Sequence, residues 1–221
     1  LVIFDRAISQ KRSGIEYPQE DNRKDRYLSR EEANILLKAL IVRSQEVHDM
    51  ALLALHAGLR FGEIAHLTWG DVEIFQGIMK LRQTKNGKDR AAYMSREVQE
   101  MFSRRGPGEA SSLVFPTRGS NNKPHAMISS VYYKAVKILF NQGVTDKKKL
   151  VDFHTLRHSF ASWLVESGTG IYQVQELLGH SDLKMTERYA HNSQDQLKKA
   201  VAGLHSTDDN HMTKEMESSS C

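Results

Sequence analysis

Three consecutive stretches near the end of the chain decide the fold. They read "HTLRHSFASWLVESG" (residues 154–168), "GIYQVQELLGH" (170–180) and "SDLKMTERYA" (181–190). Apolar residues recur in them at helical spacing, and Gly168 and Gly179 stand where helix C-caps are expected. These stretches predict three short helices in succession.

Residues 28–70 are also expected to be helical. In "LSREEANILLKAL" (28–40), Ser29 and Glu32 form a capping box ahead of an apolar stripe. "HDMALLALHAGLR" (48–60) predicts a more buried helix that stops near Gly58, and "FGEIAHLTWGDV" (61–72) predicts a further short one that ends around Trp69-Gly70.

The periodicity then changes. Residues 71–94 contain short runs of Val, Ile, Leu and Tyr broken by turn residues, among them Asn86-Gly87. They predict a three-stranded antiparallel sheet. We expect the later elements to be a helix at 95–105, a brief strand in 113–125, an amphipathic helix at 127–142 and a last helix at 193–204. The fold class is therefore α+β, mainly α, with one small sheet.

Composition sets broad bounds on function. The 221 residues carry a net charge of +4, which permits a nucleic-acid partner without establishing one. The single cysteine, Cys221, allows no internal disulfide and favours a reducing, cytoplasmic setting. The sequence contains no run of about 18 apolar residues, so it predicts no membrane span. Residues 1–27 are interpreted as an upstream helix remnant and linker, and residues 204–221 as a disordered tail.

Charged and polar residues interrupt the apolar patterns at six places. These candidate site residues are Arg60, Lys85, His154, Arg157, His180 and Tyr189. Two guanidiniums, one ammonium, two imidazoles and one phenol suit an anionic substrate whose negative charge grows during reaction. Each residue alone also has an ordinary structural interpretation, such as a core tyrosine, a helix-end histidine or a solvated lysine, so the hypothesis depends on the joint pattern.

Four motifs in order resemble the catalytic domain of the tyrosine recombinases, the phage integrase family. They are "AGLRFGEIAHLTWGDV", "TKNGKDR", "HTLRHSFASWLVESG" and "LLGHSDLKMTERYAH". The resemblance covers about residues 28–203, which defines the expected catalytic domain. All six active-site positions carry the residue type that the family has there.

The resemblance implies a mechanism without metal or cofactor. Tyr189 would attack a DNA phosphate to form a 3′-phosphotyrosine and free a 5′-hydroxyl. His154 would act as base and Lys85 as general acid, with Lys88 as the local rival for Lys85. Arg60, Arg157 and His180 would contact the phosphate oxygens, while Glu63 would orient the arginines.

The expected partner is double-stranded DNA at recombination or attachment sites. The crowding of basic residues on the hairpin and in the following loop points to four phosphate contacts, at Arg82, Lys88, Arg90 and Arg118. The resemblance further implies a homotetramer on DNA, a prophage or other mobile element as context, a bacterial cytoplasm and room for accessory DNA-bending proteins.

Two alternative functions remain open at this point. A type IB topoisomerase would use the same chemistry to relax supercoils, and a non-catalytic DNA-binding relative would need no nucleophile. His154 and His158, four residues apart on one helix, also have the spacing of a zinc-binding pair. No Glu lies between them as the metalloprotease motif requires, so His158 is interpreted as a packing or supporting residue.

Overall fold

The computed structural model describes residues 26–82, 89–189 and 201. Several sequence predictions lie outside these residues: the upstream segment through residue 25, the hairpin turn with Lys85 and Lys88, the last helix apart from residue 201, and the tail at 204–221.

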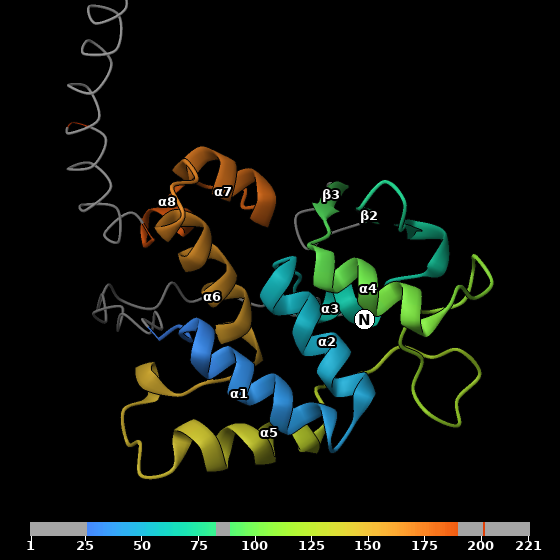
Figure 1. Cartoon of the computed structure of the whole chain (residues 1–221), viewed down its shortest axis with the longest axis horizontal. Helices are drawn as coiled ribbons and strands as arrows, with labels where there is room; N and C mark the ends of the chain where they lie inside the picture. Colours follow the sequence, from blue (N-terminus) through green and yellow to red (C-terminus); the bar gives the residue numbers. More distant parts are fainter. Residues whose placement is uncertain (1–25, 83–88, 190–200, 202–221) are drawn as a thin grey trace, which may run out of the picture.

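Helices make up most of the described chain (Figure 1). In order they are α1 (Arg30–Ile41), α2 (Gln45–His56), α3 (Phe61–Ala65), α4 (Arg96–Arg105), α5 (Ser130–Val136), α6 (Phe153–Glu166), α7 (Ile171–Leu178) and α8 (Lys184–Glu187). Short 3-10 turns occupy Trp69–Asp71 and Lys147–Lys149, and a π-helical turn, Lys137–Asn141, extends α5. None of the helices in this part of the chain is long and apolar enough to cross a membrane.

The predicted sheet is confirmed. Strands β1 (Val72–Glu73), β2 (Ile78–Leu81) and β3 (Arg90–Tyr93) pair antiparallel in the order β1-β2-β3. Leu81 lies opposite Arg90 at the end of the β2–β3 pair, where the hairpin leaves the described region.

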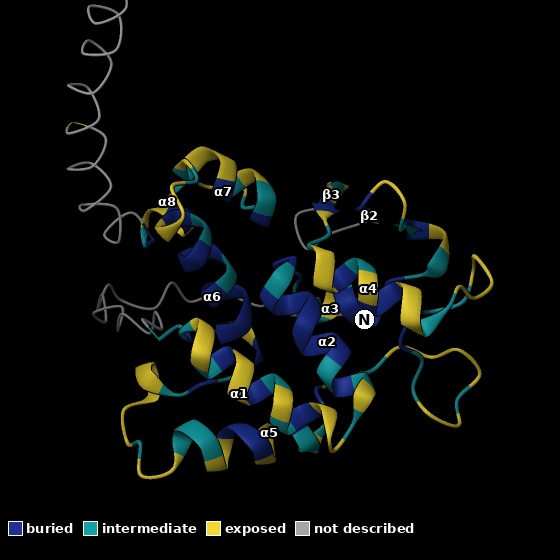
Figure 2. Cartoon of the chain, viewed as in Figure 1, coloured by how far each residue is buried: buried dark blue, intermediate teal, exposed yellow. Residues whose placement is uncertain are grey.

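Helix α2 is the centre of the core. Its residues from Met50 to Leu55 are all buried, and it contacts α1, α4 and α6. Figure 2 shows it as a buried helix between the α1–α6 side and α4. Ser44 caps its first turn by accepting a hydrogen bond from the backbone N–H of Val47, so the helix begins earlier than the sequence pattern predicted.

A second, smaller core joins the three helices with which the sequence argument began. Its buried members are Ala161, Val165, Val174, Leu178 and Tyr189. Helices α6 and α7 contact each other, as do α7 and α8. Their packing brings the segment after Leu178 back onto the face of α6 that carries the polar motif.

Several predicted boundaries were wrong for local reasons. The helix predicted from residue 61 to about Gly70 breaks after Ala65, because the Thr68 hydroxyl bonds the Asp71 carboxylate and starts a separate 3-10 turn. The helix predicted from residue 127 begins only at Ser130, where Ser129 caps it. Helix α8 covers only Lys184–Glu187 of its predicted range.

The brief strand predicted in 113–125 is also absent from the described residues. Only isolated bridges form there, between Thr68 and Leu113 and between Pro116 and Pro124. Proline has no backbone N–H to donate, so this segment cannot extend a ladder.

Candidate active site

Arg157 ties together the three segments that surround the candidate site. It lies on α6 and is 2% exposed. Its Nη1 donates to the carbonyl of Gly58, after α2, and its Nη2 donates to the carbonyl of Leu178, at the end of α7, each at 2.5 Å. The second bond satisfies a free carbonyl at the negative end of the helix dipole. The arginine therefore holds the site together from inside.

Gly58 permits this arrangement. Its φ is +65°, and a Cβ there would lie 2.5 Å from a ring carbon of Phe160 on α6. A residue without a side chain lets the loop after α2 approach α6 closely enough for the carbonyl to meet Arg157.

Glu63 is the carboxylate around which the arginines gather. Its Oε1 accepts from Nη1 of Arg60 at 3.0 Å, and its Oε2 accepts from Nη2 of Arg90 at 2.8 Å and lies 3.9 Å from Nη1 of Arg157. The same Oε2 also accepts from the Arg60 backbone N–H at 2.8 Å, which seats Glu63 in the first turn of α3. One carboxylate thus faces three guanidiniums, and the cluster keeps an excess of positive charge.

Arg90 lies elsewhere than the sequence led us to expect. It was predicted to face DNA phosphates, but its side chain is 10% exposed and reaches inward from β3. Besides Glu63 it donates to the carbonyl of Leu177 at 2.8 Å. Gly179, in the left-handed C-cap of α7, leaves the space that this side chain occupies. Arg90 therefore links the sheet to α3 and α7.

Tyr189 packs in the small core and is 5% exposed. Its hydroxyl oxygen lies 2.5 Å from Nδ1 of His158, which is 7% exposed. The guanidinium of Arg188 is 5.4 Å from the centre of the phenol ring. The sequence interpretation of His158 as a packing or supporting residue missed this contact. No pattern in the neighbouring sequence predicts this contact, because the two residues are 31 positions apart.

The other two histidines lie around this contact. The ring of His154 meets that of His158 edge-on, with centroids 4.5 Å apart. His180 follows Gly179 in the loop after α7, where its Nδ1 lies 2.8 Å from the hydroxyl oxygen of the buried Thr186. The structure therefore brings five of the six predicted residues into one region, and Lys85 lies outside the described residues.

The electrostatics of the site follow from burial and excess positive charge. Burial, and next the charge of Arg60, lower the pKa of Arg157 to about 9, so this guanidinium stays charged at neutral pH. Burial works to raise the pKa of Glu63, but the charge of Arg90 and the other donors outweigh it and lower that pKa. Glu63 is therefore an anion at neutral pH.

The histidines are held neutral for the same two reasons. Burial and then the charge of Arg157 lower the pKa of His180 to about 3, and they also lower the pKa of His154. Burial raises the pKa of Tyr189 against the opposing charges of Arg188 and Arg157. The phenol is therefore protonated in this state, and its activation needs an acceptor for the proton.

Comparison with models of known protein families identifies the family of this chain. The model of the phage integrase family matches residues 26–196. The chain belongs to the phage integrase family. This chain is 33% identical, over 177 residues, to the tyrosine recombinase XerA of Thermococcus kodakarensis. The match covers 78% of this chain and 60% of XerA, so this chain spans about three fifths of that relative's length.

Solved structures share the integrase fold. The catalytic domain of bacteriophage HP1 integrase is 25% identical with a TM-score of 0.60, covering 80% of this chain and 93% of that one. The Tn1549 transposon integrase, solved in complex with circular intermediate DNA, is 22% identical with a TM-score of 0.62 and covers 83% of this chain and 68% of that one. At 22% identity, the similarity to the Tn1549 integrase is evidence for the fold alone.

The other described candidates, Arg82 and Arg118, are exposed. Arg82 follows β2 and pairs with Asp71 at 2.8 Å, with two thirds of its side chain exposed. Arg118 is exposed in the loop after Phe115. Lys88 lies outside the described residues. Among those described, no group of three or more His, Cys, Asp or Glu is arranged to hold a metal ion.

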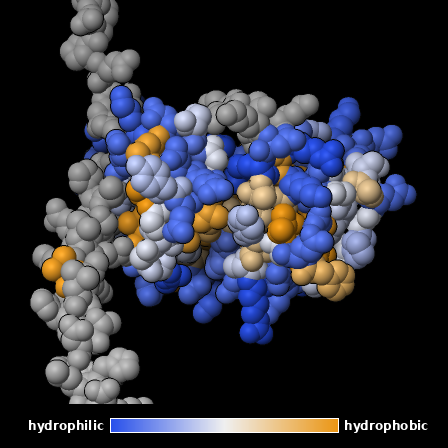
Figure 3. Space-filling view, turned by 90° about the horizontal axis from the view of Figure 1, so that it is seen from above, coloured by the Kyte–Doolittle hydropathy of each residue, from blue (hydrophilic) through white to orange (hydrophobic). Residues whose placement is uncertain are grey.

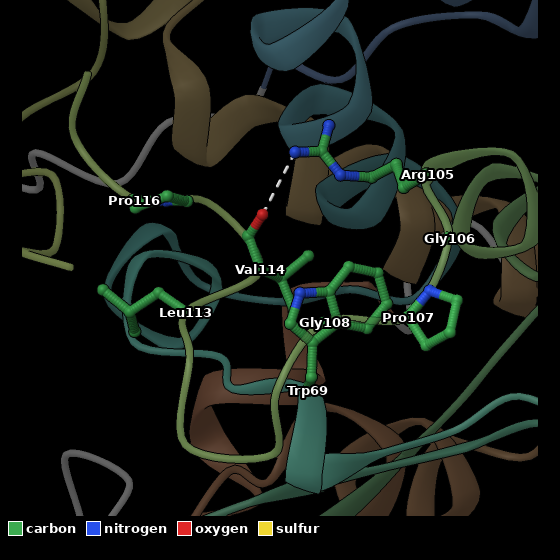
Figure 4. Close-up of a pocket in the computed structure, with 8 residues that line it drawn as sticks. All are labelled: Trp69, Arg105, Gly106, Pro107, Gly108, Leu113, Val114 and Pro116. Atoms are coloured by element: carbon green, nitrogen blue, oxygen red, sulfur yellow. Dashed lines mark hydrogen bonds between the residues drawn. The ribbon is translucent and has the colours of Figure 1, made fainter. Parts of the chain in front are cut away.

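A separate pocket lies at the C-terminal end of α4. Its volume is about 460 Å³, and Figure 4 shows the Trp69 ring beside Pro107 and Gly108 at its wall. Arg105 closes one side by donating to the carbonyl of Val114 at 3.0 Å. None of the predicted site residues lines this pocket.

Proposed function

We propose that this chain is the catalytic part of a site-specific DNA recombinase with Tyr189 as its nucleophile. The observation that supports it best is the joint placement of the phenol beside His158 and of Arg60 and Arg157 about one carboxylate, Glu63. Such a group of fixed cations suits a phosphodiester in which negative charge develops during displacement.

In the proposed reaction the Tyr189 oxygen bonds to phosphorus and the bond from phosphorus to the 5′-oxygen breaks. The phenol proton passes to a base, for which His154 is the candidate. Lys85 gives a proton to the departing 5′-oxygen, which leaves as a hydroxyl. The 3′-phosphotyrosine conserves the phosphodiester bond energy, so a 5′-hydroxyl can reverse the step without ATP.

The substrate is proposed to be double-stranded DNA. Figure 3 views the molecule from the side on which α7, β2 and β3 lie, and that face is mainly hydrophilic with small, separate hydrophobic areas. Arg82 and Arg118 are exposed and available to phosphates, whereas Arg90 belongs to the support of Glu63. A tetramer on DNA, accessory bending proteins, a mobile-element context and a cytoplasmic location are proposals carried over from the family resemblance.

A nicked suicide substrate tests the proposal. Duplexes made from the DNA that flanks the chain's own gene, nicked at successive positions, should trap the wild type as a covalent protein–DNA adduct. Tyr189→Phe should bind the same duplexes without linking. The matched control is Tyr172→Phe, which removes the hydroxyl of a tyrosine 71% exposed on α7 and should link normally.

Two results would count against this assignment. If Tyr189→Phe still forms the adduct, the nucleophile is another residue. If the protein relaxes supercoiled plasmid alone and never exchanges strands between duplexes, the topoisomerase alternative is the better description.

A further inference from the structure

Which of His158 and Tyr189 donates the hydrogen bond between them is decided by a second contact of the His158 ring. Nδ1 of His158 lies 2.5 Å from the phenol oxygen, and Nε2 of the same ring lies 3.2 Å from Nη2 of Arg188. Both ring nitrogens are therefore occupied. The phenol can donate or accept, so its bond alone leaves the position of the ring proton open.

Arg188 removes that freedom. A guanidinium has only N–H donors and no acceptor. Nε2 can bond to it only as the unprotonated nitrogen of the ring. A neutral imidazole carries one proton, which then sits on Nδ1 and points at the phenol.

We propose that Arg188 fixes His158 in the tautomer that donates from Nδ1 to the Tyr189 oxygen, so that His158 positions the nucleophile and does not act as its base. The role is a further one within the proposed function and rests on it. The ring keeps its proton throughout, and the phenol proton leaves to a separate acceptor. When it leaves, the Nδ1–H bond becomes charge-assisted and favours the tyrosinate.

The charges around His158 keep it neutral. The groups that face it are Arg188 and Tyr189, from the segment after α8, Arg157 and His154, from α6, and His180, from the loop after α7. Burial, followed by the charge of Arg188, lowers the pKa of His158 to about 2. A second ring proton would meet the Arg188 guanidinium head-on. The same arrangement that orients the ring therefore prevents it from taking up the phenol proton.

The tautomer can be measured without any DNA. Nitrogen-15 spectra of the histidine rings in this chain should show the His158 proton on Nδ1. In Arg188→Met, which lacks the donor, the Nε2-protonated form should appear beside it. A proton on Nε2 in the wild type, or a ring in Arg188→Met that is unchanged, would overturn the proposal.

Two conservative variants test the role in the reaction. The amide of Asn at position 158 can place an N–H near the position of Nδ1, whereas the longer Gln places its amide near Nε2. His158→Asn should form the suicide-substrate adduct within about tenfold of the wild-type rate, and His158→Gln should be slower by about 10²-fold. Equal melting temperatures for the two variants would exclude a folding defect as the cause of the difference.

The failures of the two proposals are distinguishable. If His158→Asn and His158→Gln are equally inactive while the wild type forms the adduct, His158 is the base and this proposal is overturned. If the wild type itself forms no adduct, the proposed function fails, and the nitrogen-15 spectra still decide how Arg188 and His158 interact.

Discussion

The side chain of Arg90 runs so close to Gly179 that a Cβ at that glycine would lie 2.4 Å from Cδ of the arginine. The backbone of Gly179 also has a φ of +62°, in the left-handed region. This glycine therefore does two things: it ends α7 and it makes room for the arginine that reaches Glu63.

Gly179→Ala should consequently be more damaging than an ordinary helix-end substitution. We expect a loss of about 2–4 kcal/mol in the free energy of unfolding, from left-handed strain of about 1–2 kcal/mol together with the displacement of Arg90 from its partners. The control is Gly143→Ala, where φ is +76° and nothing lies within 4 Å of the added Cβ. Urea unfolding of both variants separates strain from collision, and equal losses would show that the Arg90 contact has no importance.

Substitutions at Arg157 and Arg60 should affect the free energy of unfolding and the rate of adduct formation to different extents. Arg157→Lys keeps the charge, but one ammonium cannot replace a fork that bridges the carbonyls of Gly58 and Leu178. We expect it to lower the free energy of unfolding by about 2–3 kcal/mol, since a buried acceptor loses its partner, and to abolish the adduct.

Arg60→Lys is the matched comparison because the Arg60 side chain is more exposed, at 19%, and it pairs with Glu63 without bridging two segments through their carbonyls. It should reduce adduct formation while changing the free energy of unfolding by less than about 1 kcal/mol. A stability loss as large as that of Arg157→Lys would contradict the different roles assigned to the two arginines.

Stability should fall as the pH drops from 6.5 to 5. The folded-state pKa values of His158 and His180 are about 2 and about 3, below the ordinary value of 6.5. Below pH 6.5 the unfolded chain binds protons that the folded one excludes, so the stabilisation is full above that pH and is lost progressively below it. Each imidazole contributes up to about 1.4 kcal/mol per pH unit, or about 2–3 kcal/mol for both between pH 6 and 5.

The variant that tests this dependence is His158→Asn combined with His180→Asn, which should reduce the slope over that interval. The lowered pKa values of His154 and His56 keep part of the slope. The interval lies above the ordinary pKa values of Glu63 and Asp49, 4.5 and 3.8, whose lowered pKa values add acid sensitivity only at lower pH. Urea unfolding at successive pH values gives both curves. Parallel curves for wild type and variant would mean that other groups take up the protons.

Arg118 should contribute to DNA affinity through charge alone. It is exposed in a loop, so Arg118→Ala is expected to weaken binding to all duplexes alike and to reduce the slope of log K against log salt by about one. Arg43→Ala is the control, since Arg43 precedes α2 at the end remote from Gly58. Fluorescence anisotropy between low and moderate salt measures both slopes, and equal effects of the two substitutions would remove Arg118 from the interface.

Local sequence was sufficient for the elements whose signals are local. The Ser29–Glu32 capping box, the three-stranded sheet and the glycine after α7 form as predicted. The caps depend on hydrogen bonds within a few residues, and the sheet pairs neighbouring strands such as Ile78 with Tyr93 across short turns. The boundaries at Ala65 and Ser130 were missed because competing side-chain bonds at Thr68 and Ser129 override the apolar periodicity.

Sequence by itself determined the composition of the site: the order of its motifs and the chemical types of Arg60, His154, Arg157, His180 and Tyr189. Tertiary structure alone decided which imidazole meets the phenol and where Arg90 points. His158 lies 31 positions from Tyr189, and Arg90 lies 27 from Glu63 and 87 from Leu177. Hydrogen bonds over such separations depend on how α6, α7 and the sheet pack against one another. The residues next to Arg90 in the sequence therefore carry no pattern that predicts its inward orientation.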